Sequence, residues 1–396
     1  MRRYFNTEGQ CEPEEHYMVR IDDRLEQIKR LFVDREKYFV INKGRQYGKT
    51  TTLRALSKYL KPDYAVVLMD FQEAGTAEFE TEARFSMAFA KMFIKALRTA
   101  DVDHGEEWIR PLVSFIKEAE NVTLMELFYR LSSVCGAADK PVVLMVDEVD
   151  SASNNQVFVD FLALLRSYYI AKRDTPIFHS VILAGVYDIK NLKLKLRPDE
   201  EHRLNSPWNI AAKFTVDMDF SAGQIMGMLQ EYENDNHTGM DIKETAEEIY
   251  RYTAGYPYLV SAVCKILDEE LSSKETFWNK EHIWSGEGVT EAVKIILKER
   301  ISLFDSMIRQ VSEYPDMKKM LHAILFQGET VSYNPDNQAI HLAHMFGYVV
   351  DKNGNVRVSN RIFEMRLYNF FLSEDELTSA IGNAGDGGRS KKGMQP

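Results

Sequence analysis

The feature that most constrains this chain is a polar, glycine-containing loop between a short apolar run and a helical pattern. Residues 38–41 (YFVI) are apolar and β-prone, the loop runs from Lys43 to Thr50 (KGRQYGKT), and residues 50–60 have helical spacing. A strand, a tight loop and a helix in this order form a cradle in which backbone N–H groups and the positive end of a helix bind phosphate. We therefore predict a phosphate-binding loop with a nucleotide as its ligand.

The residue types of this loop suit a triphosphate. Gly48 lets the backbone approach the ligand closely, Lys49 would reach the β- and γ-phosphates, and the hydroxyl of Thr50 would bind Mg²⁺. The usual first glycine of such a loop is replaced by Lys43, one position before Gly44. The further residues predicted to contact the nucleotide are Gly44, Arg45, Gln46, Tyr47 and Thr51.

A second apolar run, at residues 142–150 (VVLMVDEVD), ends in acidic side chains. Beside a phosphate-binding loop, Asp147 would hold Mg²⁺. Glu148 would polarise the attacking water as general base, an effect of about 10²–10⁴ in rate. Asp150 would either support these two residues or cap the helix that begins near Ser151. The cofactors predicted from both motifs are ATP and Mg²⁺.

Short apolar strands alternate with helical stretches over the first half of the chain. Such strands, when helices separate them, are typical of a parallel sheet that is covered on both faces. We therefore predict an α/β fold with a parallel five-stranded sheet and helices on both faces. Its strands are expected at residues 38–41, 64–71, 142–146, 178–184 and 214–220.

The pattern changes twice after residue 220. Helical signals come first, and then two helical stretches precede a hairpin signal at Asn353-Gly354 and a last helix, which together are the pattern of a winged helix. The glycine-rich end of the chain is predicted to be disordered. The predicted domains are an N-terminal segment (1–36), an α/β core (37–220), a helical lid (221–312), a winged helix (313–373) and a disordered tail (374–396).

Lys49, Thr50, Asp147 and Glu148 together resemble the additional-strand catalytic-glutamate class of P-loop ATPases. In that class a further strand lies between the loop strand and the acidic strand, and residues 178–184 are the candidate for it. From residue 5 to about 372, the chain resembles an AAA+-like family of bacterial and archaeal ATPases with a helical lid and a winged helix. The segments that carry this likeness are Phe5 to Thr7, His16-Tyr17, Arg45-Gln46, Gly185 to Asp188, Ser206 to Asn209, Gly255 to Pro257 and Asn360 to Glu364.

The resemblance implies an ATPase that is slow or stimulated by a partner, and it suggests further site residues. Tyr17 would lie near the adenine and Pro257 near the nucleotide. The alternatives are a packing role for Tyr17 and, for Pro257, the start of a helix. The candidates for a sensor of the γ-phosphate are Tyr187, Asp188 and Asn191. Arg251 is the candidate for a lid residue that contacts the phosphates. The candidates for an arginine finger are Arg166, Arg173, Arg197 and Arg203.

The distribution of charged residues limits which partners the chain can bind. The chain has 49 Lys and Arg against 60 Asp and Glu, a net charge of −11, which argues against nucleic acid held over the whole surface. The predicted recognition helix at residues 337–346 contains neither Lys nor Arg. Since DNA affinity depends largely on phosphate neutralisation, charge disfavours DNA as a partner of the winged helix.

Cysteine usage and hydropathy suggest the compartment. Cys11, Cys135 and Cys264 have neither zinc nor disulfide spacing, as in a reducing compartment. No secretory signal is evident, and no apolar run approaches the ~18 residues that a membrane helix needs. We expect a cytoplasmic protein with no membrane partner.

Three functions stay open at this point. The first is an ATP-dependent molecular switch that acts through an unidentified protein partner or through a homo-oligomer. The second is an initiator or mobile-element protein that uses ATP to assemble on DNA. The third is a degenerate ATPase that binds nucleotide as a structural ligand.

Overall fold

The computed structural model describes residues 3–99, 107–117, 122–153, 155–186, 208–273 and 279–386. The chain divides into two compact units. Unit 2 comprises residues 21–218, and unit 1 comprises residues 1–20 together with residues 219–396. The first twenty residues, expected to lead into the core, therefore belong to the same unit as the segments that follow the core.

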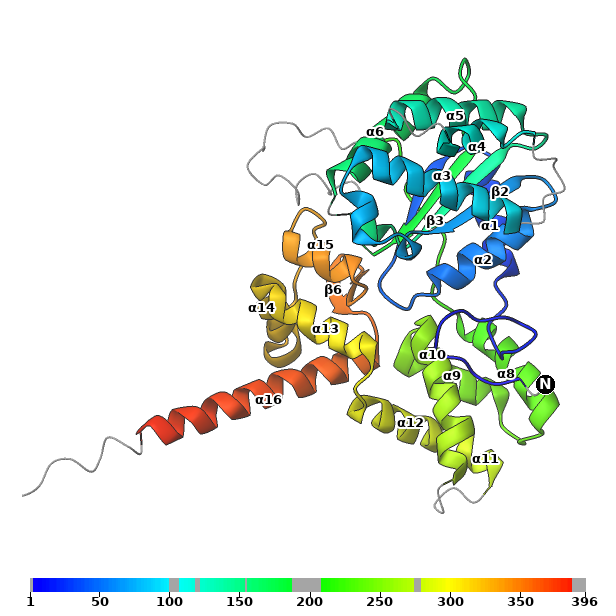
Figure 1. The fold of residues 1–396 in the computed structure, drawn as a ribbon. Helices are drawn as coiled ribbons and strands as arrows, with labels where there is room; N and C mark the ends of the chain where they lie inside the picture. Colours follow the sequence, from blue (N-terminus) through cyan, green and yellow to red (C-terminus); the bar gives the residue numbers. More distant parts are fainter. Residues whose placement is uncertain are drawn as a thin grey trace, which may run out of the picture. The chain divides into compact units, whose positions relative to one another are not determined.

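A four-stranded parallel sheet forms the centre of unit 2 (Figure 1). Strand β4 pairs with both β1 and β3, so the strand predicted at 178–184 lies between the loop strand and the acidic strand. Because the strands are parallel, their carboxyl ends meet at one edge of the sheet. The strands, in their order across the sheet, are β1 (Tyr38–Asn42), β4 (Ser180–Gly185), β3 (Val142–Asp147) and β2 (Ala65–Asp70).

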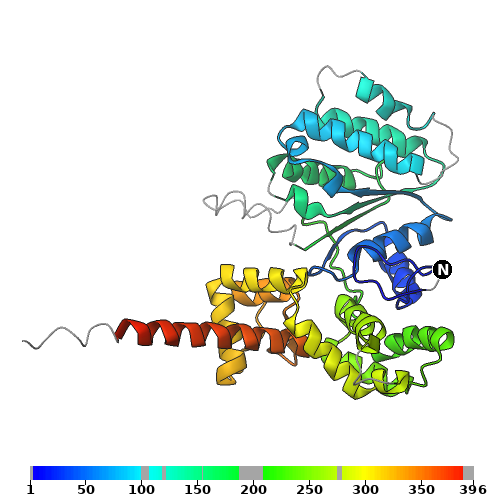
Figure 2. The ribbon, with the colours of Figure 1, turned by 60° about the horizontal axis from the view of Figure 1, so that its bottom comes forward.

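Helices cover both faces of this sheet (Figure 2). The side chains of β3 and β4 are buried throughout. On one face, α2 packs against β2, β3 and β4, with α1 beside it. On the other face, α3 to α6 pack around an aromatic cluster in which Phe161 contacts Phe85, Phe89 and Phe128. The helices are α1 (Asp22–Ile28), α2 (Lys49–Leu60), α3 (Glu82–Thr99), α4 (Arg110–Lys117), α5 (Leu124–Ala137) and α6 (Gln156–Ile170).

The fifth strand, expected at residues 214–220, does not form. Ala212 makes a single parallel bridge to Phe39 at the edge of β1, and the ladder goes no further. Beyond this bridge the backbone finds other partners. The guanidinium of Arg24 donates to the carbonyl of Met218 at 2.9 Å, and the N–H of Phe220 donates to the carbonyl of Gly255 at 2.8 Å. The alternating pattern of this segment buries Val216 and Met218 without a strand ladder.

Unit 1 begins with the N-terminal segment, which packs on a helical layer. The rings of Phe5 and Tyr17 lie 5.1 and 5.0 Å from the ring of Tyr232, and Phe5 also lies 5.8 Å from Trp284. Arg3 adds ion pairs to Glu231 and Asp235. The helices of this layer are α8 (Ala222–Asn236), α9 (Ile242–Thr253), α10 (Pro257–Lys265), α11 (Lys280–Ile283) and α12 (Gly286–Lys298).

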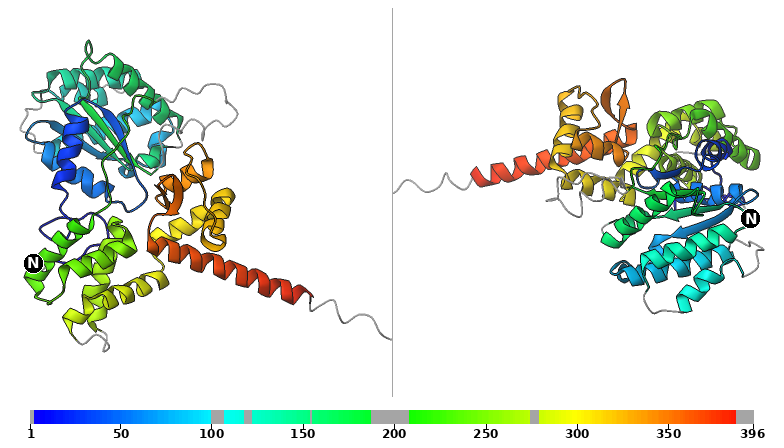
Figure 3. Two further views of the ribbon diagram at one scale, coloured as in Figure 1. Left: turned by 180° about the vertical axis from the view of Figure 1, so that it is seen from behind. Right: turned by 90° about the horizontal axis from the view of Figure 1, so that it is seen from above.

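The rest of unit 1 contains helices and one two-stranded hairpin (Figure 3). The predicted turn is present, since Asn353 and Gly354 have φ angles of 55° and 80° and join two antiparallel strands. The elements are α13 (Ser302–Glu313), α14 (Pro315–His322), α15 (Gln338–Met345), β5 (Val349–Lys352), β6 (Asn355–Val358) and α16 (Arg361–Asp386).

Helix α16 continues to Asp386, so residues 374–386 are helical and differ from the disordered tail that the sequence predicts. An ion pair between Lys318 and Glu374 at 2.7 Å ties the start of this stretch to α14. Among the described residues, no helix combines the length and the apolar character that a membrane crossing requires.

Candidate functional site

The predicted phosphate-binding loop joins β1 to α2. Gly48 precedes the first residue of α2 with a left-handed backbone (φ 69°), and Gln46 is also left-handed (φ 56°). The N–H of Lys43 donates to the carbonyl of Gly185, the last residue of β4, at 3.3 Å. The loop is thus attached to the sheet at the edge where the parallel strands end.

Lys49 is the most enclosed charged residue of the loop. Its side chain is only 7% exposed, and its ammonium group donates to the carbonyls of Lys43 (3.0 Å) and Gly44 (2.8 Å). Burial lowers the pKa of Lys49, and the negative charges of Glu148, Asp150 and Asp147 act in the opposite direction. A buried ammonium surrounded by loop carbonyls is suited to an anionic ligand.

Thr50, the second residue of α2, meets Asp147, the last residue of β3. The hydroxyl of Thr50 hydrogen-bonds to the carboxylate of Asp147, and the N–H of Glu148 donates to the same carboxylate at 2.9 Å. Burial nevertheless raises the pKa of Asp147. A hydroxyl and a carboxylate side by side supply the hard oxygen ligands that Mg²⁺ prefers, so these residues fit the predicted metal.

Glu148 has an unusual backbone. Its φ and ψ of 51° and 42° lie in the left-handed region, which costs a non-glycine residue roughly 1–2 kcal/mol. Burial, followed by the charge of Asp147, raises the pKa of Glu148. A carboxyl group with a raised pKa is better matched to proton transfer near neutral pH than an ordinary glutamate.

Asp150 connects the acidic strand to the end of β4. Its carboxylate accepts a 2.6 Å hydrogen bond from the N–H of Val186. A Cβ atom at Gly185 would lie 2.8 Å from this carboxylate and 2.9 Å from Val149, so the position has no room for a side chain. Asp150 therefore ties together the two strands that border the site, a contact that the sequence did not predict.

Asp70 is a residue that the sequence analysis missed. It ends β2 directly opposite Asp147 in the register of the sheet, and its negative charge raises the pKa of both Asp147 and Glu148. The side chain accepts a hydrogen bond from the N–H of Gln72 at 2.8 Å. The sequence does contain a sign of this residue. The strand predicted at residues 64–71 has an acidic residue near its end, as the strand that ends in Asp147 does.

The other predicted loop residues differ in exposure. Arg45 is exposed, Gly44 and Tyr47 are buried, and Gln46 and Thr51 are partly buried. The Lys43 ammonium lies 5.5 Å from the centre of the Tyr47 ring.

Tyr17 and Pro257 belong to unit 1, whereas the phosphate-binding loop belongs to unit 2. The Tyr17 side chain is 1% exposed, and its hydroxyl donates to Asp235 at 2.9 Å. Pro257 is buried and begins α10. Tyr17 is thus packed within unit 1, and its place near the adenine stays a prediction.

The remaining candidates lie in several places. Arg166 is on α6, Arg173 is exposed after it, and Arg251 forms an ion pair with Glu248 on α9. The other sensor and finger candidates, Tyr187, Asp188, Asn191, Arg197 and Arg203, lie outside the described residues.

A parallel sheet with β4 inserted between β1 and β3, and with the loop and the acidic strand at one edge, is the architecture of Walker-type P-loop proteins. Residues 16–373 match the AAA-like domain family, and the chain belongs to this family. A comparison with curated proteins found no match.

Three solved structures are similar to this chain, and one of them, with a TM-score of 0.61, shows the same fold. A Walker-type ATPase of Pyrococcus abyssi is similar over 92% of this chain and 99% of its own, with a TM-score of 0.61 and 13% identity. The ORC2 protein of Aeropyrum pernix in its ADP form has a TM-score of 0.46 and 13% identity, over 93% of this chain and 97% of its own. The RuvB branch-migration motor of Thermotoga maritima has a TM-score of 0.42 and 12% identity, over 88% of this chain and 94% of its own.

Proposed function

We propose that this protein binds ATP with Mg²⁺ and hydrolyses it to ADP and phosphate. The observation that carries the proposal is the joined arrangement of Lys49, Thr50 and Asp147, with Glu148 next to them, at one edge of the sheet. The Thr50–Asp147 hydrogen bond brings the two predicted oxygen ligands together, and the buried ammonium group stands in the same loop. Membership of the AAA-like family supports the same conclusion.

Each residue would have a defined role. The loop N–H groups and Lys49 would bind the phosphates, and Thr50 and Asp147 would hold Mg²⁺, which neutralises phosphate charge. Glu148 would take a proton from the attacking water, as in the catalytic-glutamate class that the motif resembles. Asp150 would keep the end of β4 against the acidic strand through its bond to Val186.

The test compares the wild type with Glu148→Gln. The amide has nearly the same shape but cannot accept the proton, so we expect ATP affinity to be retained and turnover to fall by about 10²–10⁴. Asp160→Asn, on the exposed face of α6, is a matched control that should hydrolyse normally. A Glu148→Gln protein with wild-type turnover would remove this residue from the mechanism.

We further propose that the ATPase works as a switch, with the helical layer at 221–312 as a lid and residues 313–373 as a winged helix. Its partner would be an unidentified protein or a second copy of the chain. The alternatives are a DNA-assembling initiator and a degenerate nucleotide-binding protein. Turnover that rises with protein concentration supports self-assembly, turnover that rises with DNA supports the initiator, and no turnover at all supports the degenerate form.

A further inference from the structure

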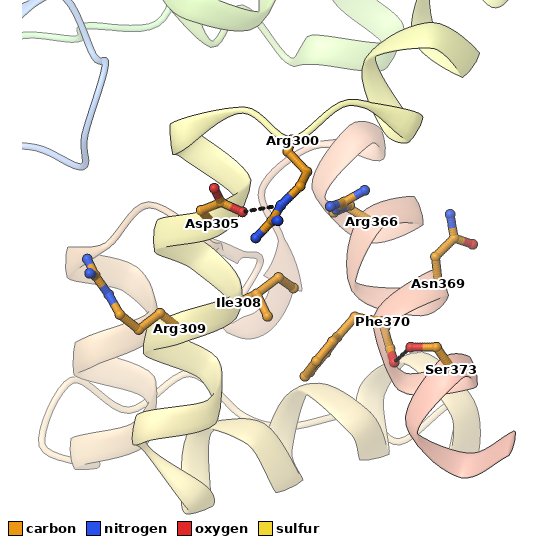
Figure 4. Close-up of a pocket in the computed structure, with 8 residues that line it drawn as sticks. All are labelled: Arg300, Asp305, Ile308, Arg309, Arg366, Asn369, Phe370 and Ser373. Atoms are coloured by element: carbon orange, nitrogen blue, oxygen red, sulfur yellow. Dashed lines mark hydrogen bonds and ion pairs between the residues drawn. The ribbon is translucent and has the colours of Figure 1, made fainter. Parts of the chain in front are cut away.

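A cavity of about 670 Å³ lies between α13 and α16 of unit 1 (Figure 4). Its volume is in the range of roughly 300–1,000 Å³ that small-molecule sites occupy. Three of its lining residues are arginines. The lining consists of Arg300, Asp305, Ile308, Arg309, Arg366, Asn369, Phe370 and Ser373.

Positive charge exceeds negative charge at this cavity. Arg300, from the segment between α12 and α13, extends toward Asp305, and Arg366 projects from α16 beside it (Figure 4). Arg309 points away from both, on the other side of α13 (Figure 4). The single acid in the lining, Asp305, lies 3.9 Å from Arg300, a weak and exposed ion pair. The guanidinium groups of Arg300 and Arg366 are therefore opposed by one carboxylate in the lining.

Arg366 is fixed in place without a carboxylate partner. It donates to the carbonyl of Leu297 at 2.5 Å, and its guanidinium lies 4.9 Å from the centre of the Phe304 ring. Within the described part of the chain, neither Arg366 nor Arg309 forms an ion pair. Burial lowers the pKa of Arg366, which means that an anion bound here would relieve the cost of the buried charge.

The apolar part of the cavity lies between the two helices. Phe370 from α16 and Ile308 from α13 point into the space below Arg300 and Arg366 (Figure 4). An aromatic ring next to guanidinium groups is the combination by which proteins bind a base and its phosphate at once. The volume also exceeds what a bare phosphate would fill.

We propose that this cavity is a second ligand site, which binds a nucleoside phosphate with the phosphate between Arg300 and Arg366 and the base against Phe370. The ligand is either a free nucleotide or one nucleotide of a single strand, since both present the same chemistry. The site lies in unit 1 and is independent of the proposed ATPase site in unit 2.

The experiment measures binding of two probes to the full chain by fluorescence anisotropy. The probes are labelled thymidine 5′-monophosphate and a labelled thymidylate trinucleotide. Labelled thymidine and labelled hexaglutamate serve as the phosphate-free control and as the acidic-peptide alternative. The variants are Arg300→Gln, whose side chain is 88% exposed, and Phe370→Leu. Lys298→Gln, which removes an exposed charge two residues before Arg300 and outside the lining, is the matched control.

We expect Arg300→Gln to weaken binding about tenfold or more, because a charge-assisted contact is lost. We expect Phe370→Leu to weaken it about fivefold or more, because a base loses its stacking partner. Lys298→Gln should change little. Lys49→Ala should leave the probes bound, which separates this site from the phosphate-binding loop.

Other outcomes are decisive as well. Binding of the monophosphate indicates a free nucleotide, whereas binding of the trinucleotide alone indicates a single strand, and both support the site. The proposal is overturned if neither probe binds, if hexaglutamate or thymidine binds as tightly, or if Lys49→Ala abolishes binding while Arg300→Gln has no effect.

Discussion

At the scale of single residues, the ammonium of Lys49 illustrates how the fold prepares a charge for a ligand. Two loop carbonyls accept its hydrogen bonds, three carboxylates act on its charge, and burial still lowers its pKa. These two hydrogen bonds of the ammonium go to carbonyl oxygens, and a triphosphate would add an anion in direct contact. The residue can therefore contribute more to binding than to folding.

Replacing Lys49 with alanine should therefore weaken ATP binding strongly while the fold persists. The loss of charge-assisted contacts corresponds to at least about tenfold in affinity. Titration calorimetry with Mg-ATP measures the affinity, and circular dichroism checks the fold. Lys61→Ala, exposed just after α2, is the control and should bind ATP normally. An unchanged affinity in a folded Lys49→Ala protein would refute the assignment of the loop.

The raised pKa of Glu148 makes a separate prediction about stability. The folded state favours the protonated carboxyl, so ionisation costs stability as the pH rises above the unfolded value near 4.5. Glu148→Gln removes this cost. We expect the variant to melt at a higher temperature than the wild type at pH 7.5, with a gain that shrinks toward pH 4. Thermal scans across this range measure it, and a gain that grows toward low pH would contradict it.

At the scale of elements, the turn before α10 has a structural task of its own. Gly255 has a φ of 77°, and a Cβ atom at this position would lie 1.9 Å from the carbonyl oxygen of Phe220. The same glycine accepts the hydrogen bond from the N–H of Phe220. The Gly-Tyr-Pro turn thus fixes the backbone at Phe220, just before the start of α8. This structural role does not depend on whether the turn contacts a nucleotide.

Gly255→Ala should destabilise the protein far more than Gly328→Ala. Both residues have a positive φ, but nothing lies within 4 Å of a Cβ atom at Gly328. Gly328→Ala should cost about 1–2 kcal/mol for the backbone alone, and Gly255→Ala should exceed it by at least about 2 kcal/mol for the clash. Urea denaturation measures both, and equal losses would show that the turn relaxes freely.

The sequence predicted the elements whose signal is local. The four sheet strands, the loop helix and the Asn353-Gly354 turn each combine a hydrophobic pattern with a boundary residue, and all are present. The prediction of a strand at residues 214–220 was wrong. An alternating hydrophobic pattern indicates which side chains are buried, but it does not indicate where the backbone hydrogen bonds go. There, Arg24 and Gly255 provide partners that lie almost 200 and 35 residues away.

The same limit applies to the site. Lys49, Thr50, Asp147 and Glu148 could be found because their motifs are short and specific. Asp70 and the contact of Asp150 with Val186 depend on which strands become neighbours, and that follows only from the sheet order β1-β4-β3-β2. Pairing between strands is not encoded within either strand.

At the scale of the whole molecule, charge sets an expectation for DNA. Helix α15 has neither Lys nor Arg, and the chain carries a net charge of −11. We expect the full chain to bind duplex DNA no more tightly than roughly 10⁻⁴–10⁻⁶ M at physiological salt, with a steep loss as salt rises. Electrophoretic or anisotropy titration with unrelated duplexes measures this. Nanomolar, sequence-selective binding would favour the initiator instead.

The chain passes between its two units twice, after Arg20 and after Met218, and this has a consequence for synthesis on the ribosome. Unit 2 is complete once residue 218 has emerged. Phe5 and Tyr17 emerge early, but their partners Tyr232 and Trp284 follow more than 200 residues later. At translation rates of about 5–20 residues per second, these aromatic side chains wait roughly 10–50 seconds for their packing site. During that interval the growing chain exposes an unpacked aromatic segment, and we expect chaperones that bind short aromatic segments to recognise it.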